Sequence, residues 1–278
     1  MIRHQHGNEY FLFTQDDHAR LSGVLAENFG NRRFTAPEPR KAVIEAVAMH
    51  DRGWPLHDNE PTLNEGGFPL HVFETPISIT APVWTESVRL ARNVDSYTAF
   101  LVSLHVFHLS ALSYQHYTDP QDRRRNAKSL FELNKFQQSQ IEMQEHFRQE
   151  MGLRTDVPLE LGLAPRGSNA EETQLRFNYQ LLKAMDQISL AALCDGRAFT
   201  TIEDVAPSPG ADPLELHLGY PAEWMVSVSP WPFGIEQIEM EMPFRRLPAR
   251  AYADVEEFRK AYSAAPKEMQ IVRVMKST

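Results

Sequence analysis

The sequence predicts a mainly α-helical protein, a helical bundle with a small, strand-rich C-terminal appendage of the α+β type. Through the first 196 residues, apolar positions recur at the spacing of three and four that is typical of helices. Several of these segments begin at capping residues and end at glycine or proline. Beyond residue 196 the pattern changes to alternating apolar and polar residues, which is typical of strands. We therefore expect a bundle over residues 1–196 and an appendage over residues 197–278.

The first two predicted helices carry recognisable end signals. Residues 14–30 begin with Thr14 and Asp17 in capping-box spacing and end at Gly30. The next segment, "PRKAVIEAVAMHDRGWP", ends at Gly53 and the following proline. Both segments predict amphipathic helices with one face toward a core.

Four further helices complete the predicted bundle. A loop rich in proline and glycine is expected over residues 56–82, and its length suggests a lid. After it come a short helix over 83–93, an apolar helix over 96–117 and a long amphipathic helix over 119–152. A connecting segment over 153–169 leads to the last helix, for which Ser168 and Glu171 have capping-box spacing and Gly196 is the expected C-cap.

The appendage is expected to contain strands and one helix. "MVSVSP" and "QIEMEMPF" alternate as half-buried strands do, and "QIVRV" near the end belongs to the same pattern. The segment "EYFLF" near the start is a candidate to pair with them. One amphipathic helix, "ADVEEFRKAYSAA", interrupts the strands.

The composition narrows the class of protein. A net charge of -9 over 278 residues argues against binding to a nucleic-acid backbone, which needs a basic face. The most apolar window, residues 97–112, is short and contains two histidines, so no membrane span is expected. A single cysteine, Cys194, permits no intrachain disulfide and suits a reducing cytoplasm. We expect a soluble cytoplasmic protein with a small-molecule partner, and a homo-oligomer is compatible with the sequence.

Several predicted helices aim a histidine or an aspartate toward the core. His50 in "AVAMHDRGW" shares its face with Val43 and Val47, and Asp51 follows it directly. The same reasoning turns inward the residues His18, His105 and Asp186. A buried carboxylate needs a partner or a cation, and imidazole with carboxylate is a common ligand set for divalent metals. For each residue the alternative is an ordinary buried polar side chain with a hydrogen bond.

These pieces, "QDDHARLSG", "AMHDRGW", "VSLHVFHLS" and "LKAMDQISL", resemble the HD-domain superfamily of metal-dependent phosphohydrolases, and in particular an uncharacterised bacterial branch of it. The resemblance implies an HD-like all-helical bundle. Carried over residue by residue, it implies that the metal ligands are His18, His50, Asp51 and Asp186. His105 matches a further histidine that serves a second ion or the substrate. The "MPFRRLP" segment of the tail fits the same branch.

The resemblance implies hydrolysis of an anionic phosphoester or a nucleotide-like small molecule with one or two divalent ions. The ion is Mn, Fe, Zn, Ni, Co or Mg, and it activates a water molecule. We expect Asp51 to orient this water, and Arg52 or Lys183 to offset charge in the transition state. Gln15, three residues before His18, is a candidate to bond a ligand or a water, and Trp54 is a candidate to stack on a substrate ring. The second pair, His57 and Asp58, is expected in a solvated loop.

Two other functions stay open at the level of the sequence. The same ligand set with His105 and His108 suits a di-iron oxygenase of the HD type, which iron content and oxygen consumption would distinguish. Alternatively, the protein is a binding or interaction module that keeps a structural metal and has no activity.

Overall fold

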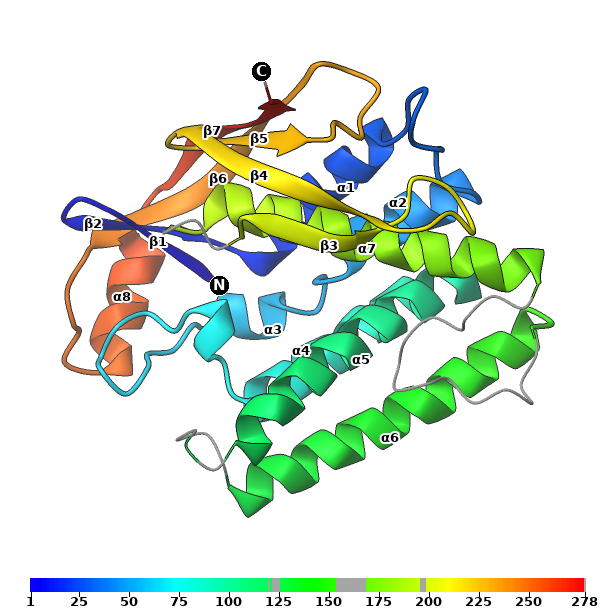
Figure 1. The fold of residues 1–278 in the computed structure, drawn as a ribbon. Coiled ribbons are helices and arrows are strands. Elements are labelled where there is room, and N and C mark those ends of the chain that lie inside the picture. Colours follow the sequence, from blue (N-terminus) through cyan, green and yellow to red (C-terminus); the bar gives the residue numbers. More distant parts are fainter. Residues whose placement is uncertain (120, 122–125, 154–168, 196–198, 278) are drawn as a thin grey trace.

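The structure is a computed structural model of residues 1–278, and it describes all of them except 120, 122–125, 154–168, 196–198 and 278 (Figure 1). The helices are α1 (Gln15–Asn28), α2 (Arg40–Met49), α3 (Pro55–Asp58), the 3-10 helix η1 (Val72–Glu74), α4 (Ile77–Arg92), α5 (Ser96–Thr118), α6 (Ala127–Glu150), α7 (Ala170–Leu193) and α8 (Val255–Ala264). The strands are β1 (Ile2–His6), β2 (Glu9–Phe13), β3 (Thr201–Val205), β4 (Leu214–Ala222), β5 (Met225–Ser229), β6 (Gln237–Pro248) and β7 (Lys267–Lys276).

All seven of these strands form one mixed sheet in the order β1-β2-β6-β7-β5-β4-β3. β5 and β7 are parallel, and the other neighbours are antiparallel. β2 pairs with β6 through Tyr10 and Leu247, so strands from the two ends of the chain lie side by side. The sheet is thus assembled mainly through contacts between residues far apart in the sequence.

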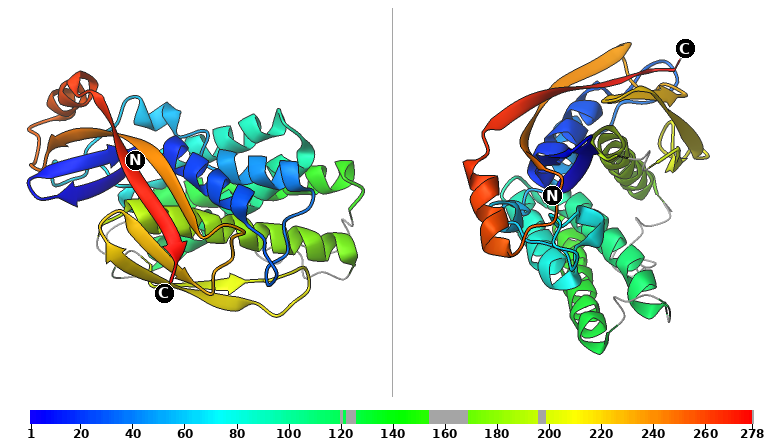
Figure 2. Two further views of the ribbon diagram at one scale, coloured as in Figure 1. Left: turned by 90° about the horizontal axis from the view of Figure 1, so that it is seen from above. Right: turned by 90° about the vertical axis from the view of Figure 1, so that its left-hand side faces the viewer.

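The curled sheet wraps around α1 and α7, and α4, α5 and α6 lie on the far side of these two helices (Figure 2). One continuous hydrophobic core includes residues of the sheet and of the helices, for example Phe13, Leu25, Leu182 and Val274. A second, smaller core packs α8 against β2 and β6 through Tyr10, Leu247 and Phe258. The architecture is therefore α8, then the sheet, then two layers of helices.

The prediction of a mainly α bundle with a small β-rich appendage is wrong. Half of the residues are helical and 22% are in strands, and the sheet is a half-barrel that makes this an α+β fold. The alternation in β6 and β7 was visible, but three strands, β1, β3 and β4, were not expected. A sheet depends on pairing between distant segments, so the size of this one cannot be inferred from the period of each segment alone.

The predicted long loop is also partly structured. Residues 56–82 include the end of α3, all of η1 and the first turns of α4, which begins at Ile77. Pro82 lies inside α4, where a proline usually ends a helix. The expected connecting segment over 153–169, the predicted cap Ser168 and the predicted C-cap Gly196 lie wholly or mostly outside the described residues. Within the described part of the chain, none of the helices combines the length and apolar character needed to cross a bilayer.

Two glycines allow the close packing that brings the helices carrying the candidate site together. A Cβ atom on Gly23 of α1 would lie 2.6 Å from the Cβ of Ala48 on α2, so α1 and α2 touch there without an intervening side chain. A Cβ on Gly53 would lie 2.0 Å from the carbonyl oxygen of Val83 on α4. The Gly53 amide instead donates a hydrogen bond to Ser87 Oγ at 2.9 Å. These contacts fix the positions of His18, His50 and Asp51.

Candidate metal centre

The five predicted ligands come from four segments and lie close to one another in the interior. His18 lies on α1, His50 caps the C-terminus of α2 and Asp51 follows it, His105 lies on α5, and Asp186 lies on α7. All five residues are buried, and the most exposed of them, Asp186, has an exposed fraction of 7%. The structure therefore brings together all the residues that sequence reasoning assigned to a metal.

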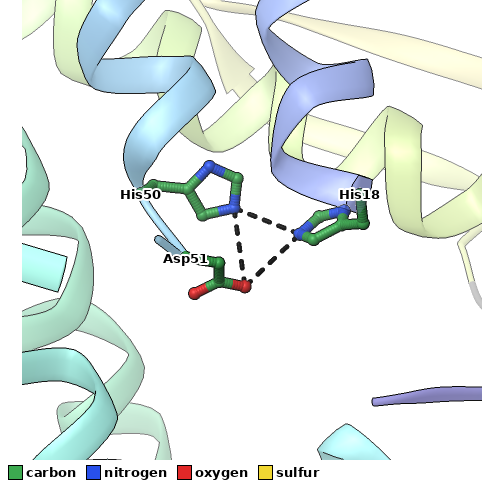
Figure 3. Close-up of side chains that lie close together, drawn as sticks. All are labelled: His18, His50 and Asp51. Atoms are coloured by element: carbon green, nitrogen blue, oxygen red, sulfur yellow. Dashed lines mark hydrogen bonds and ion pairs between the residues drawn. The ribbon is translucent and has the colours of Figure 1, made fainter. Parts of the chain in front are cut away.

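The donor atoms of His18, His50 and Asp51 lie within a few ångströms of one another (Figure 3), and those of His50, His105 and Asp186 form a second such group. His18 Nε2 lies 3.1 Å from His50 Nε2, 3.5 Å from Asp51 Oδ2 and 3.2 Å from Asp186 Oδ1. His50 Nε2 lies 3.8 Å from Asp51 Oδ2 and 3.4 Å from Asp186 Oδ1. Ligands bound at about 2.1 Å lie about 3.0 Å apart along an octahedral edge and about 3.4 Å apart along a tetrahedral edge. Four of the five separations, from 3.1 to 3.5 Å, match the edges of such a polyhedron around one ion, and the 3.8 Å between His50 and Asp51 is longer than either edge.

We call His18, His50, Asp51, His105 and Asp186 the cluster. Hydrogen bonds orient His18 and His50 so that Nε2 of each ring faces the other donor atoms of the cluster. His50 Nδ1 donates to the backbone carbonyl of Val47 at 2.7 Å. Ser189 Oγ lies 2.6 Å from His18 Nδ1, 2.7 Å from Ser22 Oγ and 2.8 Å from the carbonyl oxygen of Asp186. When its proton goes to the Asp186 carbonyl, the hydroxyl accepts from His18 Nδ1. When an ion replaces the protons shared around the Nε2 atoms, Nδ1 carries the proton in each ring and both Nε2 lone pairs can point at the ion. Histidine ligands of metals commonly have such a fixed second nitrogen.

The electrostatics of the cluster also favour a cation. Burial by itself lowers the pKa of His50, but the nearby carboxylates of Asp51 and Asp186 outweigh it and raise that pKa to about 9. Burial by itself raises the pKa of Asp186, yet hydrogen bonds with His18 and His50 hold it well below the usual range. Asp186 is thus ionised, and without an ion His50 keeps its proton to well above neutral pH. A divalent ion supplies positive charge in place of that proton.

His105 stands apart from the other four residues. Its Nε2 lies 3.9 Å from Asp186 Oδ2, and its Nδ1 is buried with no hydrogen-bond partner among the described residues. Burial lowers the pKa of His105 to about 3, so the ring is neutral. His105 forms a second possible ligand group with His50 and Asp186. It therefore suits a second ion or a bound substrate better than the first ion.

Asp51 is held by two neighbours. The indole N–H of Trp54 donates to Asp51 Oδ1 at 3.0 Å, and Gln15 Nε2 donates to Asp51 Oδ2 at 3.2 Å. Because Oδ2 also faces His18 and His50, Gln15 touches the same oxygen that would bind an ion. The sequence suggested a ligand or a water as the partner of Gln15, and the structure places the carboxylate of Asp51 there.

A cavity of about 400 Å³ opens onto this cluster. Asp51, His105 and Asp186 line it together with Gln15, Trp54 and residues of η1, α4, α5 and α7. Its volume falls in the range of small-molecule sites. An ion held by the cluster would thus have positions that face a space large enough for a substrate.

The two predicted cationic residues lie elsewhere. Arg52 Nη1 contacts both carboxylate oxygens of Asp16, at 2.8 and 2.6 Å, and does not line the cavity. Lys183 Nζ pairs with Asp204 Oδ2 at 3.0 Å, near β3, and does not line it either. The guanidinium group of Arg52 and the ammonium group of Lys183 are therefore both paired with carboxylates outside the site.

Other residues differ from what the sequence suggested. His57 and Asp58 lie on α3 and are buried, with His57 Nδ1 3.2 Å from Asp58 Oδ1, so they are not a solvated loop pair. His108 does not line the cavity. Sequence reasoning missed Ser189, although its position three residues after Asp186, on the same helix face, was a usable signal.

A family model matches residues 1–249 of the chain, and its description is "Protein of unknown function (DUF3891)". No curated protein and no solved structure matches. The resemblance to the HD-domain superfamily is wrong, because the matching family is a different one and the seven-stranded sheet is foreign to an all-helical HD fold. Inward-facing His and Asp residues on packed helices arise in any fold that surrounds a cation with helices, so their order along the chain does not identify a superfamily.

Proposed function

The chain belongs to the family DUF3891, and we propose from its site that it is a metal-dependent hydrolase of a small molecule. The convergence of His18, His50, Asp51 and Asp186 supports this proposal most. Most of the separations between their donor atoms suit ligands around one ion, and both imidazoles are oriented by a second hydrogen bond. Metal-free burial of two carboxylates beside two histidines would be a costly arrangement.

The residues around such a site have different roles. His18, His50, Asp51 and Asp186 would hold the ion, which lowers the pKa of a bound water and polarises the bond to be cleaved. Gln15 and Trp54 fix the carboxylate of Asp51, so that its oxygens keep a constant orientation. The mainly apolar wall of the cavity makes its surroundings less polar and so strengthens electrostatic interactions at the cluster.

A phosphoester is the proposed reacting group, and the ion is Mn, Fe, Zn, Ni, Co or Mg. Because Arg52 and Lys183 are engaged with Asp16 and Asp204, the ion itself must supply the countercharge. The mixed imidazole and carboxylate set suits Mn, Fe, Zn, Ni or Co better than Mg, which prefers oxygen ligands. The cytoplasmic location suggested by the single cysteine belongs to the same proposal.

The test is elemental analysis of the purified protein, before and after incubation with each of these ions. The wild type is compared with Asp186→Asn, which keeps shape but removes a charged ligand, and with His108→Gln as a matched control. His108 lies on the same helix as His105 but is not in the cluster. Hydrolysis of bis(p-nitrophenyl) phosphate, an aromatic phosphodiester, is followed in the same samples.

We expect one or two equivalents of a transition metal and diester hydrolysis in the wild type and in His108→Gln, with both lost in Asp186→Asn. Iron together with oxygen consumption, and no hydrolysis, would favour the di-iron oxygenase instead. Metal without either activity would leave a binding module with a structural ion. A protein that binds none of the ions would contradict the proposal.

A further inference from the structure

The cavity above the cluster has a wall that is mainly apolar and aromatic. Trp54 and Trp84 contribute indole rings, Leu109 and Leu190 contribute aliphatic side chains, and Phe73 contributes a phenyl ring. Trp54 and Trp84 are buried, so their positions are set by the core rather than by a ligand. Such a wall binds a flat or ring-sized apolar group through burial and stacking.

The charge of the site limits the charge of its ligand. Two carboxylates, those of Asp51 and Asp186, balance one divalent ion, and the histidines are neutral when their Nε2 atoms are ligands. Among the described residues that line the cavity, none is lysine or arginine. Apart from His105 and the exposed His116, the described lining offers a dianionic group no countercharge beyond the ion, so its entry into a mainly apolar space is unfavourable. A neutral or singly charged group would not carry this cost.

One buried polar atom of a residue that lines the cavity lacks a partner among the described residues. Gln15 lines the cavity and is only 2% exposed, and its Oε1 has no hydrogen-bond partner among the described residues. The direction of the amide is fixed, because a carboxylate accepts only from the NH2 group and Gln15 Nε2 is bound to Asp51 Oδ2. The free end is thus a carbonyl oxygen beside the metal ligand Asp51. Buried acceptors of this kind normally have a donor.

From these three observations we propose a substrate class, which rests on the metal-dependent function proposed above. The substrate has an aromatic or similarly apolar body and brings at most one negative charge to the ion. It also carries an N–H or O–H donor next to the reacting group, and Gln15 Oε1 accepts its hydrogen bond. Gln15 is thus a specificity-determining residue, and polyphosphates and phosphate monoesters are excluded as preferred substrates.

Hydroxamates test this class without knowledge of the natural substrate. Benzohydroxamic acid binds a metal through two oxygens, carries one negative charge and has a phenyl body with an adjacent N–H. N-Methylbenzohydroxamic acid keeps the metal-binding oxygens and lacks the N–H, acetohydroxamic acid lacks the ring, and phenylphosphonate carries a second charge. Dissociation constants are measured by calorimetry on the metal-loaded wild type, on Gln15→Met and on Thr80→Val. Thr80 is a matched control, because it is buried and lines the same cavity, while the side-chain hydrogen bonds described for Asp51 come from Gln15 and Trp54.

In the wild type we expect benzohydroxamate to bind at least about tenfold more tightly than its N-methyl analogue, because the analogue leaves Gln15 Oε1 unpaired. It should also bind more tightly than acetohydroxamate and phenylphosphonate. The N–H preference should fall to about twofold or less in Gln15→Met and persist in Thr80→Val. If Gln15→Met kept the same preference for benzohydroxamate over its N-methyl analogue as the wild type, the preference would come from the bulk of the N-methyl group. That result would overturn the role of Gln15.

The possible failures are distinguishable. If the loaded protein binds the four probes without preference, the substrate class falls and the metal-dependent function stands. Tighter binding of phenylphosphonate than of benzohydroxamate would likewise overturn the limit on charge. If the wild type takes up no metal, the proposed function fails, and the substrate class fails with it. Metal content is measured in Gln15→Met, so that loss of the ion is not mistaken for loss of recognition.

Discussion

Replacing Ser189 with alanine should weaken metal binding without unfolding the protein. Ser189 Oγ is the acceptor for His18 Nδ1 at 2.6 Å, in a position with 0% exposure. When an ion occupies the cluster, His18 must keep Nε2 free of a proton, so Nδ1 carries the proton and needs an acceptor. In the metal-free variant the ring can exchange tautomers and donate from Nε2 to Asp186 Oδ1, which lies 3.2 Å away. The cost of the lost hydroxyl therefore falls mainly on the metal-bound state.

An unpaired buried donor costs about 1–3 kcal/mol. At about 1.4 kcal/mol for each factor of ten, this predicts a dissociation constant about 10- to 100-fold higher than that of the wild type. Competition with a chromophoric chelator measures this constant, and urea unfolding of the metal-free protein measures stability. Ser110→Ala is the control, because Ser110 is equally buried and donates to the carbonyl of Phe107 at 2.6 Å but lies outside the cluster.

The control should bind metal within about twofold of the wild type, although it loses a hydrogen bond of similar kind. An unchanged dissociation constant in Ser189→Ala would refute the assignment of the His18 tautomer. Equal weakening in both serine variants would show that the effect is a general loss of rigidity. In either case Ser189 would have no specific part in the site.

Three further predictions concern the fold and the surroundings of the site. Gly53→Ala places a methyl group 2.0 Å from a carbonyl oxygen of α4, so urea unfolding should show a loss of about 1–3 kcal/mol or more, and a loss below 0.5 kcal/mol would contradict this packing. His71 accepts a backbone hydrogen bond from η1 through Nδ1, and burial, with the charges of the N-terminal amino group and of Arg3, lowers its pKa to about 4. The unfolded state therefore takes up a proton as the pH falls from about 6.5 to 4, while the folded state does not. Between pH 6.5 and 4 the free energy of unfolding of the wild type should therefore fall by up to about 3 kcal/mol more than that of His71→Asn, which keeps an acceptor but does not titrate. Identical pH profiles of the two proteins would argue against the shift. Arg52→Ala should leave metal content and diester hydrolysis within about threefold of the wild type, because its guanidinium pairs with Asp16 outside the cavity, and loss of hydrolysis would return Arg52 to a catalytic role.

Local signals in the sequence predicted most of the helices correctly. The N-cap Thr14 accepts a hydrogen bond from the Asp17 amide at 3.1 Å, as the capping-box spacing indicated. α4 was predicted too short, because Pro82 was taken to precede the helix and instead lies within it. These features depend on neighbouring residues, which is why periodicity and capping can predict them and why a single proline can mislead.

The fold class could not be predicted in the same way. β4 carries Leu214, Leu216 and Leu218 in alternation, but its partners are β3 and β5, and the N-terminal β2 pairs with β6 more than 200 residues away in the sequence. Whether such strands form a small appendage or a half-barrel depends on which distant segments they meet. The burial of α1 and α7 under this sheet is likewise a tertiary property that helical periodicity does not specify.

The candidate site was accessible from the sequence in one respect only. Helical faces correctly turned His18, His50, His105 and Asp186 toward the interior, and the structure shows them together with Asp51. The surroundings depended on the tertiary arrangement. Pairing Arg52 with Asp16 requires the approach of α1 to the end of α2, which no spacing rule contains. The orientation of Gln15 toward Asp51 depends on the same approach.

A crystal structure of the protein loaded with manganese or zinc, with anomalous diffraction data, tests the central claim most directly. We expect an anomalous peak about 2.0–2.2 Å from His18 Nε2, His50 Nε2 and the carboxylate oxygens of Asp51 and Asp186. The peak should disappear in Asp186→Asn, with the rest of the fold unchanged. An anomalous peak elsewhere, or no peak with the two histidines hydrogen-bonded to each other and to Asp186, would contradict the assignment of a metal centre.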